Sequence, residues 1–148
     1  MSKWLGTAAI AATSVLLATS VPAQVTDPTK LEQKCEMTVG STLSKFVGSK
    51  SKCISKCFTT ARKTSGPYTG CFPPYTDTTT NTCITGSLKG AEAKTKAAIV
   101  KACTVAVPGC YTGGATGAAN TFVNSSEAKI DQQTPSIACG SPSGAFVE

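Results

Sequence analysis

The sequence predicts an all-α fold: a long antiparallel helical hairpin stapled by disulfides, followed by an irregular or weakly helical C-terminal segment. Two stretches place their apolar residues at the helical period, and a stretch dense in Gly, Pro and Thr separates them. The chain of 148 residues also holds 8 cysteines and no histidine. An even number of cysteines in a small chain with an export signal is typical of a disulfide framework.

The N-terminus has the pattern of an export signal. Lys3 supplies a positive charge, residues 5–18 form an apolar run, and small residues precede a cleavage point after Ala23. The run is too short to span a bilayer core of about 30 Å, and no second apolar stretch follows it. We therefore expect residues 1–23 to be a signal peptide. Residues 24–148 would form one secreted or periplasmic domain without a transmembrane anchor, with residues 139–148 as a frayed tail.

The first arm of the hairpin is predicted as one helix over residues 28–63, with Asp27 as N-cap and Pro28 at the first helical position. Its apolar face carries Cys35, Val39, Leu43, Phe46, Cys53, Ile54, Cys57 and Ala61. Gly48 and Ser49 interrupt the middle, and Lys50 falls on the apolar face. We expect a kink there, or a Lys50 side chain that extends to solvent.

The second arm is predicted as a helix over about residues 82–105, after a loop over residues 65–80. Its inward face carries Ile84, Leu88, Ala91, Ile99, Ala102 and Ala106. Pro108 and Gly109 end it. A weak third helix is expected between residues 118 and 132, with Phe122, Val123 and Ile130 directed inward.

The pair Cys53 and Cys57 allows a metal site, a redox pair or two disulfides to other elements. Thiolate metal sites need a second closely spaced cysteine pair, which the sequence lacks. A redox pair is favoured at the start of a helix, whereas these residues lie deep inside one. Residues four apart on a helix are poorly placed to bond to each other. We therefore expect disulfides to other elements, with metal or thiol-redox chemistry as the alternative, and no cofactor.

The spacing of the cysteines fits an antiparallel hairpin, in which facing residue numbers have a nearly constant sum. Cys35 with Cys103 and Cys57 with Cys83 satisfy this rule, and Cys53 with Cys83 satisfies it almost as well. Cys35 and Cys57 would lie about 33 Å apart along the first helix, and Cys83 and Cys103 about 30 Å apart along the second, so two disulfides can connect the helices. We predict the Cys35–Cys103 bond and leave the choice between Cys53 and Cys57 open. Cys71 would bond to whichever of Cys53 and Cys57 remains. Cys110 and Cys139 would then fasten the C-terminal segment.

A stripe of lysines on the opposite side of the first helix is the candidate anion-binding surface: Lys45, Lys52, Lys56 and Lys63. The segment between its ends contains no acidic residue, and the chain has a formal net charge of +6 at pH 7. Such a face suits anionic envelope polymers or lipid head groups, although a solvated outer face has the same composition. Arginine is rare and no aromatic residue interleaves the stripe, which argues against specific recognition of nucleic acid.

Other residues give weaker functional signals. Tyr68, Phe72 and Tyr75 lie in the Pro-rich loop, where they would either contact a partner such as another exported protein or cap the open end of the hairpin. The absence of histidine excludes His-assisted Ser or Cys catalysis and His-ligated zinc. With no catalytic constellation, the sequence favours a non-enzymatic structural or interaction protein.

The segments KFVGSKSKCISKC and SLKGAEAKTKAAIVKAC resemble those of uncharacterised secreted, lysine- and cysteine-rich helical proteins of environmental bacteria. The resemblance covers residues 35–110. It implies export and a disulfide-stapled helical fold, and it transfers no functional residue.

Overall fold

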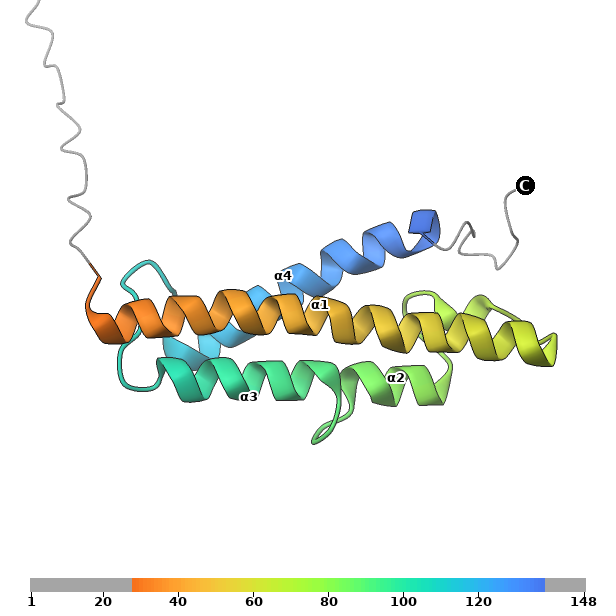
Figure 1. Ribbon diagram of the computed structural model, residues 1–148, viewed down its shortest axis with the longest axis horizontal. Helices are drawn as coiled ribbons and strands as arrows, with labels where there is room; N and C mark the ends of the chain where they lie inside the picture. The colour runs from red at the N-terminus through yellow and green to blue at the C-terminus, as the bar shows by residue number, and fades with distance from the viewer. Residues whose placement is uncertain (1–27, 138–148) are drawn as a thin grey trace, which may run out of the picture.

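The computed structural model describes residues 28–137, and every regular element in this range is a helix (Figure 1). Its elements are α1 (Lys30–Thr64), the 3-10 helix η1 (Thr69–Cys71), α2 (Thr78–Thr85), α3 (Ala91–Cys103) and α4 (Gly114–Ile137). No strand occurs among the described residues, which confirms the predicted all-α class. The predicted signal peptide, Asp27, Cys139 and the C-terminal tail lie outside them.

Helix α1 begins at a capping box. The Thr29 hydroxyl accepts a hydrogen bond from the Glu32 N–H at 3.3 Å, and the Glu32 carboxylate accepts one from the Thr29 N–H at 2.7 Å. Both bonds satisfy N–H groups that a helix start leaves without partners. The N-cap is therefore Thr29, not Asp27. The helix then passes through Gly48 without a break, and Figure 1 shows no kink there, so the predicted kink is wrong.

The second arm of the hairpin is two helices, α2 and α3, rather than the single helix predicted over residues 82–105. A tight turn separates them, closed by the hydrogen bond from the Gly90 N–H to the Gly86 carbonyl at 2.9 Å. A Cβ atom on Gly90 would lie 2.4 Å from the Gly86 nitrogen, so this approach requires glycine. Leu88 lies in the turn and is 85% exposed, so it does not belong to the inward face.

The C-terminal part of the described chain is the well-formed helix α4, which is longer at both ends than the weak helix predicted over residues 118–132. Gly113, with φ of +74°, adopts the left-handed conformation that turns the chain into it. Helix α4 packs against α3 and α1, and Figure 1 shows it crossing α1. The fold is thus a hairpin of α1 with α2 and α3, and α4 lies across it.

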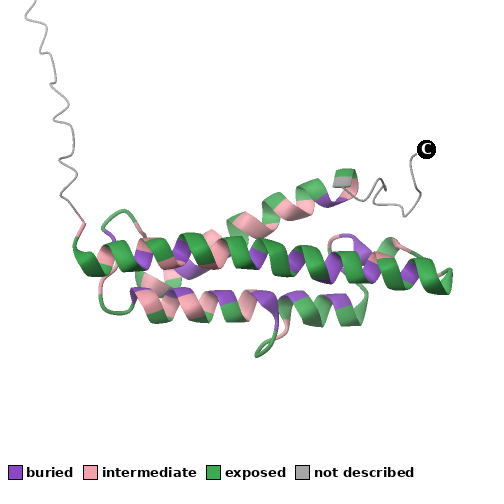
Figure 2. Ribbon diagram, in the orientation of Figure 1, coloured by how far each residue is buried: buried purple, intermediate pink, exposed green. Residues whose placement is uncertain are grey.

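The main core lies between α1, α3 and the first turns of α4. Its buried residues are Cys35, Val39, Phe46, Ala91, Ile99, Cys103, Ala119 and Val123. Two smaller clusters follow toward the end of α1, one around Ile54, Tyr75 and Ile84 and one around Cys57, Ala61 and Cys71. Figure 2 shows the buried residues of α1 along one side of the helix. The apolar face predicted for the first helix is confirmed.

Three disulfides connect α1 to the segments that follow it. They are Cys35–Cys103, Cys53–Cys83 and Cys57–Cys71. The first was predicted, and the others resolve the open choice: Cys53 bonds to α2 and Cys57 to η1. The three bonds are nested along the chain, each loop enclosing the next. Cys110 is exposed and joins no other cysteine within residues 28–137, and its expected partner Cys139 lies outside the described residues.

The disulfides are typical of an oxidising compartment, such as the extracellular space. Among the described residues, none of the helices has the length and apolar character needed to cross a membrane.

Candidate functional site

A buried lysine lies at the middle of α1, where the sequence pattern placed it on the apolar face. The Lys50 side chain is 0% exposed. Its Nζ atom lies 2.7 Å from Glu127 Oε1 and 2.5 Å from Asp131 Oδ1, both on α4. The same atom lies 5.0 Å from the centre of the Tyr75 ring. The expectation that Lys50 extends to solvent is therefore wrong, because its charge has partners inside the protein.

Tyr75 is the second component of this site. It follows η1, is 4% exposed, and donates a hydrogen bond from its hydroxyl to Asp131 Oδ1 at 2.5 Å. Burial and the bond to Asp131 raise the pKa of Tyr75 far above its usual value. The phenol therefore stays protonated and remains a hydrogen-bond donor at neutral pH.

Glu92, at the start of α3, adds a further carboxyl group. Burial raises the pKa of Glu92, and a hydrogen bond with Glu127 and the charge of Glu127 act in the same direction. Lys96, whose Nζ lies 3.7 Å from Glu92 Oε2, opposes the shift. The site thus joins one buried ammonium group, three carboxyl groups and a phenol from α1, α3, α4 and the loop before α2. We call these residues the Lys50 cluster: Lys50, Tyr75, Glu92, Glu127 and Asp131.

The energetics of the Lys50 cluster differ from those of a surface ion pair. Each buried charge costs several kcal/mol of lost hydration, which a close partner offsets only with good geometry. The two carboxylates that contact Lys50 retain 22% and 25% exposure of their side chains, so water still reaches them. Apolar residues would pack this position at lower cost. A fully buried lysine beside reactive groups is therefore a candidate for chemistry.

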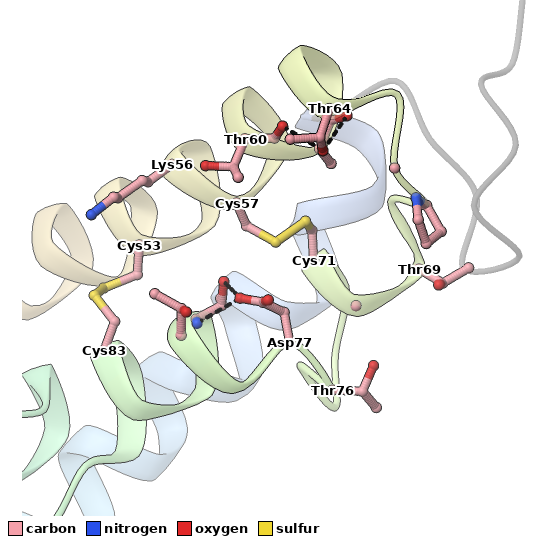
Figure 3. Close-up of a pocket in the computed structure, with 16 residues that line it drawn as sticks. Cys53, Lys56, Cys57, Thr60, Thr64, Thr69, Cys71, Thr76, Asp77 and Cys83 are labelled. Carbon is pink, nitrogen blue, oxygen red and sulfur yellow. Dashed lines mark hydrogen bonds between the residues drawn. A yellow bond between two sulfur atoms is a disulfide. The ribbon is translucent and has the colours of Figure 1, made fainter.

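A cavity of about 460 Å³ lies at the far end of the hairpin, between α1, η1 and α2. Figure 3 shows the disulfides Cys53–Cys83 and Cys57–Cys71 lying along it. Threonines supply half of the remaining lining residues: Thr60, Thr64, Thr69, Thr76, Thr79 and Thr80. Its charged residues are Lys56 and Asp77.

The polar groups of this cavity are largely committed to the fold. The Asp77 carboxylate accepts hydrogen bonds from the Thr80 N–H at 2.8 Å and the Thr80 hydroxyl at 2.7 Å, as the N-cap of α2. These bonds, the hydroxyl bond first, lower the pKa of Asp77. The Thr64 hydroxyl donates to the Thr60 carbonyl at 3.1 Å. The cavity offers space and a few hydroxyl groups, without a cluster of charges aimed into it.

The predicted lysine stripe lies on the solvent side of α1. Lys45, Lys52, Lys56 and Lys63 are all exposed. At 100° per residue they fall within a narrow arc of the helix, and they extend over about 27 Å of its length. Lys34 continues the same arc toward the start of the helix and is also exposed. The structure therefore places the predicted lysines together on one continuous surface.

The predicted contact loop does not present its aromatic residues as an exposed surface. Phe72 is 2% exposed and packs edge-on against Phe58 of α1, with ring centres 5.2 Å apart. Tyr68 is half-buried and stacks on Phe58 at 6.0 Å. Tyr75 belongs to the Lys50 cluster. These side chains cap the far end of the hairpin, as the alternative interpretation of the loop expected, because the thin core there has few other large residues.

Sequence reasoning missed the three carboxyl members of the Lys50 cluster, and it assigned Tyr75 to a contact loop instead. Lys50 on an apolar face was the available signal, but its nearest partners are about two thirds of the described chain away, at a sequence separation of 77 for Glu127. Within residues 28–137, no group of three or more His, Cys, Asp or Glu side chains has the arrangement of a metal site. No family model, no curated protein and no solved structure matches this chain.

Proposed function

We propose that this protein is an exported, non-enzymatic interaction module, and that its contact surface is the lysine stripe of α1. The stripe consists of Lys45, Lys52, Lys56 and Lys63, extended by Lys34. The partner is a linear anionic polymer of the cell envelope. The observation that supports this proposal is the alignment of these exposed lysines along one unbroken helix.

The scaffold is suited to holding such a surface. Helix α1 is tied by disulfides at Cys35, Cys53 and Cys57, so its direction is fixed along most of the stripe. A rigid row of charges loses little conformational freedom when it binds, which favours association. The lysine ammonium group is a compact charge on a flexible side chain, unlike the planar guanidinium group of arginine. Such charges suit the phosphate or carboxylate groups of a repeating polymer.

The structure favours a polymer over a lipid surface. Amphipathic helices that bind membranes insert an apolar face between the lipids. The apolar face of α1 is already occupied by α2, α3 and α4, as the burial of Phe46 and Ile54 indicates. Binding through α1 would therefore be electrostatic, and salt would weaken it.

Binding of the full exported chain to polyphosphate of defined length and to heparin, at low and high salt, tests this proposal. We expect binding at low salt that weakens by at least about tenfold at high salt, because screening is strong on the scale of the stripe. A variant with Lys45, Lys52, Lys56 and Lys63 changed to Gln should lose most of the binding. Anionic lipid vesicles serve as the third ligand, and preferential binding to vesicles would contradict the choice of a polymer.

The matched control changes the same number of exposed lysines elsewhere: Lys89, Lys94, Lys101 and Lys129 to Gln. This control has the same net charge as the stripe variant. It should retain most of the binding if the stripe is the contact surface. Equal loss in both variants would show that net charge alone is responsible, and absence of binding at low salt would refute the proposal.

A further inference from the structure

Helix α4 differs from the other helices in how it is attached. Each disulfide of the described residues joins α1 to α3, α2 or η1. The segment Gly114–Ile137 contains no cysteine, so no disulfide can hold α4 itself. Its closest polar contacts with α1 are those of Glu127 and Asp131 with Lys50. Among the described residues, these contacts are therefore where a covalent bond between α1 and α4 can form.

We propose that Lys50 and Asp131 become joined by an amide bond between their side chains, which links α1 to α4 after folding. Lys50 Nζ is the nucleophile, and it lies 2.5 Å from Asp131 Oδ1. A nitrogen in hydrogen-bond contact with one carboxyl oxygen lies beside the carboxyl carbon that it would attack. The 0% exposure of Lys50 keeps competing water away from the nitrogen.

Glu127 is the proton acceptor in this reaction. Its Oε1 atom lies 2.7 Å from Lys50 Nζ, on the same helix as Asp131 and one turn before it. A lysine nitrogen is nucleophilic only after it loses the proton of the ammonium form. Transfer of that proton to Glu127 supplies the free amine within the site. The distance is within the range expected of a general base and its proton donor.

Tyr75 activates the carboxyl group of Asp131. Its hydroxyl donates to Oδ1 at 2.5 Å, and negative charge increases on this oxygen when the nitrogen adds to the carbon. A donor placed at a developing oxyanion stabilises the transition state more than the ground state. The raised pKa of Tyr75 keeps the donor protonated at neutral pH. Asp131 is therefore the carboxyl group that reacts, and Glu127 is the one that transfers protons.

The reaction balances without an oxidant or a further reactant. One C–N bond forms between Lys50 Nζ and the side-chain carbonyl carbon of Asp131, and one C–O bond of that carboxyl group breaks. The nitrogen begins with three hydrogens and keeps one. The other two leave with the carboxyl oxygen as water, after passing through Glu127, which returns to its carboxylate form. The net change is the loss of one water molecule and of one buried pair of opposite charges.

Two physical effects favour this condensation in the folded state. Groups held in reactive contact behave as if present at effective molarities of about 10⁵–10⁸ M, which offsets the unfavourable condensation of free amine and acid in water. The amide also removes the hydration cost of burying two charges. The side chain of Asp131 is 25% exposed, so the released water has a route to solvent.

The mass of the full exported chain tests the proposal without any variant. The protein is reduced, alkylated and denatured, its N-terminus is determined, and its intact mass is compared with the mass of that sequence. We expect a mass lower by one water molecule. Trypsin should then release a branched peptide that joins residues 46–52 to residues 130–148, with no cleavage after Lys50. A full mass, or a water loss located at any other pair of residues, would overturn the proposal.

Two variants test the assigned roles. Lys50→Met removes the nucleophile and keeps a long unbranched side chain, and its mass should be the full mass. Glu127→Gln retains the size of the side chain and its capacity for hydrogen bonds, but it does not accept the proton. It should fold and form its disulfides, which far-ultraviolet circular dichroism and the non-reduced mass would verify. Its reduced mass should nevertheless be the full mass, without the loss of a water molecule. A Glu127→Gln chain that condenses as fully as the wild type, or a wild-type bond to Glu127, would overturn these roles.

Discussion

The two halves of α1 are held in different ways. The N-terminal half, residues 30–47, packs on α3 and α4 through a continuous core that includes Phe46, Ile99 and Val123. One disulfide, Cys35–Cys103, crosses this core. The C-terminal half, residues 51–64, faces α2 and η1, where the apolar clusters are small and a cavity of about 460 Å³ remains. Two disulfides join this half to the segments that face it.

This difference shows how the chain compensates for a shortage of large side chains. Where three helices meet, interdigitated side chains fill the space and burial supplies the stability. At the far end α1 faces α2 and η1, and threonines line much of the cavity between them. There the two disulfides stabilise the fold instead, because they reduce the conformational freedom of the unfolded chain. The Lys50 cluster lies at the boundary between the two halves.

The largest expected effect comes from a truncation in the N-terminal half. Phe46→Ala removes a ring that is 1% exposed and leaves a cavity in the three-helix core. We expect the free energy of unfolding to fall by about 3–5 kcal/mol in urea denaturation. Val47→Ala, at a neighbouring residue that is 41% exposed, is the control and should change it by less than about 1 kcal/mol. Equal effects would contradict the assignment of the main core.

A smaller effect is expected from removing a disulfide in the C-terminal half. Changing both Cys57 and Cys71 to Ala opens a loop with a sequence separation of 14. The expected loss is about 3 kcal/mol, because a short loop restricts the unfolded chain less than a long one. Hydrogen exchange should accelerate in η1 and the end of α1, while the amides of α3 remain protected. Loss of protection in α3 as well would show that the two halves unfold as one unit.

The smallest effect is a pH dependence at Glu92, near the boundary. Its folded-state pKa is raised above the ordinary value of 4.5, so its stabilising contribution is present below that pH and is lost as the pH rises through the raised pKa. Glu92→Gln removes this loss. The variant should therefore gain stability relative to the wild type as the pH rises above 4.5, measured by thermal unfolding at each pH. A difference that does not change with pH would contradict the coupling of Glu92 to Glu127.

The sequence predicted the elements that depend on local pattern. The apolar face of α1 and the spacing of Cys35 and Cys103 were enough for the hairpin and its first disulfide. The break between α2 and α3 was missed because Gly90 is needed for a backbone approach that the helical period does not reveal. The start of α1 was misplaced because Asp27 and Thr29 both have side chains that cap helices, and only Thr29 has Glu32 at the matching position.

The Lys50 cluster could not be predicted because it depends on tertiary structure. Lys50 finds Glu127 and Asp131 only when α4 crosses α1, and the Gly-, Ala- and Ser-rich sequence of α4 gave a weak helical signal. Tyr75 reaches Asp131 from a loop whose path no periodicity determines. By contrast, the lysine stripe was predictable from the sequence, since an exposed arc depends only on the angle between successive helical residues.

The nested order of the three disulfides has a consequence for cleavage of the backbone by proteases. A single cut of the backbone anywhere between Cys35 and Cys103 leaves two fragments that the Cys35–Cys103 bond still joins. A cut between Cys57 and Cys71 leaves them joined by all three bonds. Many of the lysines that attract trypsin-like enzymes lie inside these loops, including most of the stripe. A cleaved molecule would therefore keep both arms of its hairpin and its cationic surface in one piece.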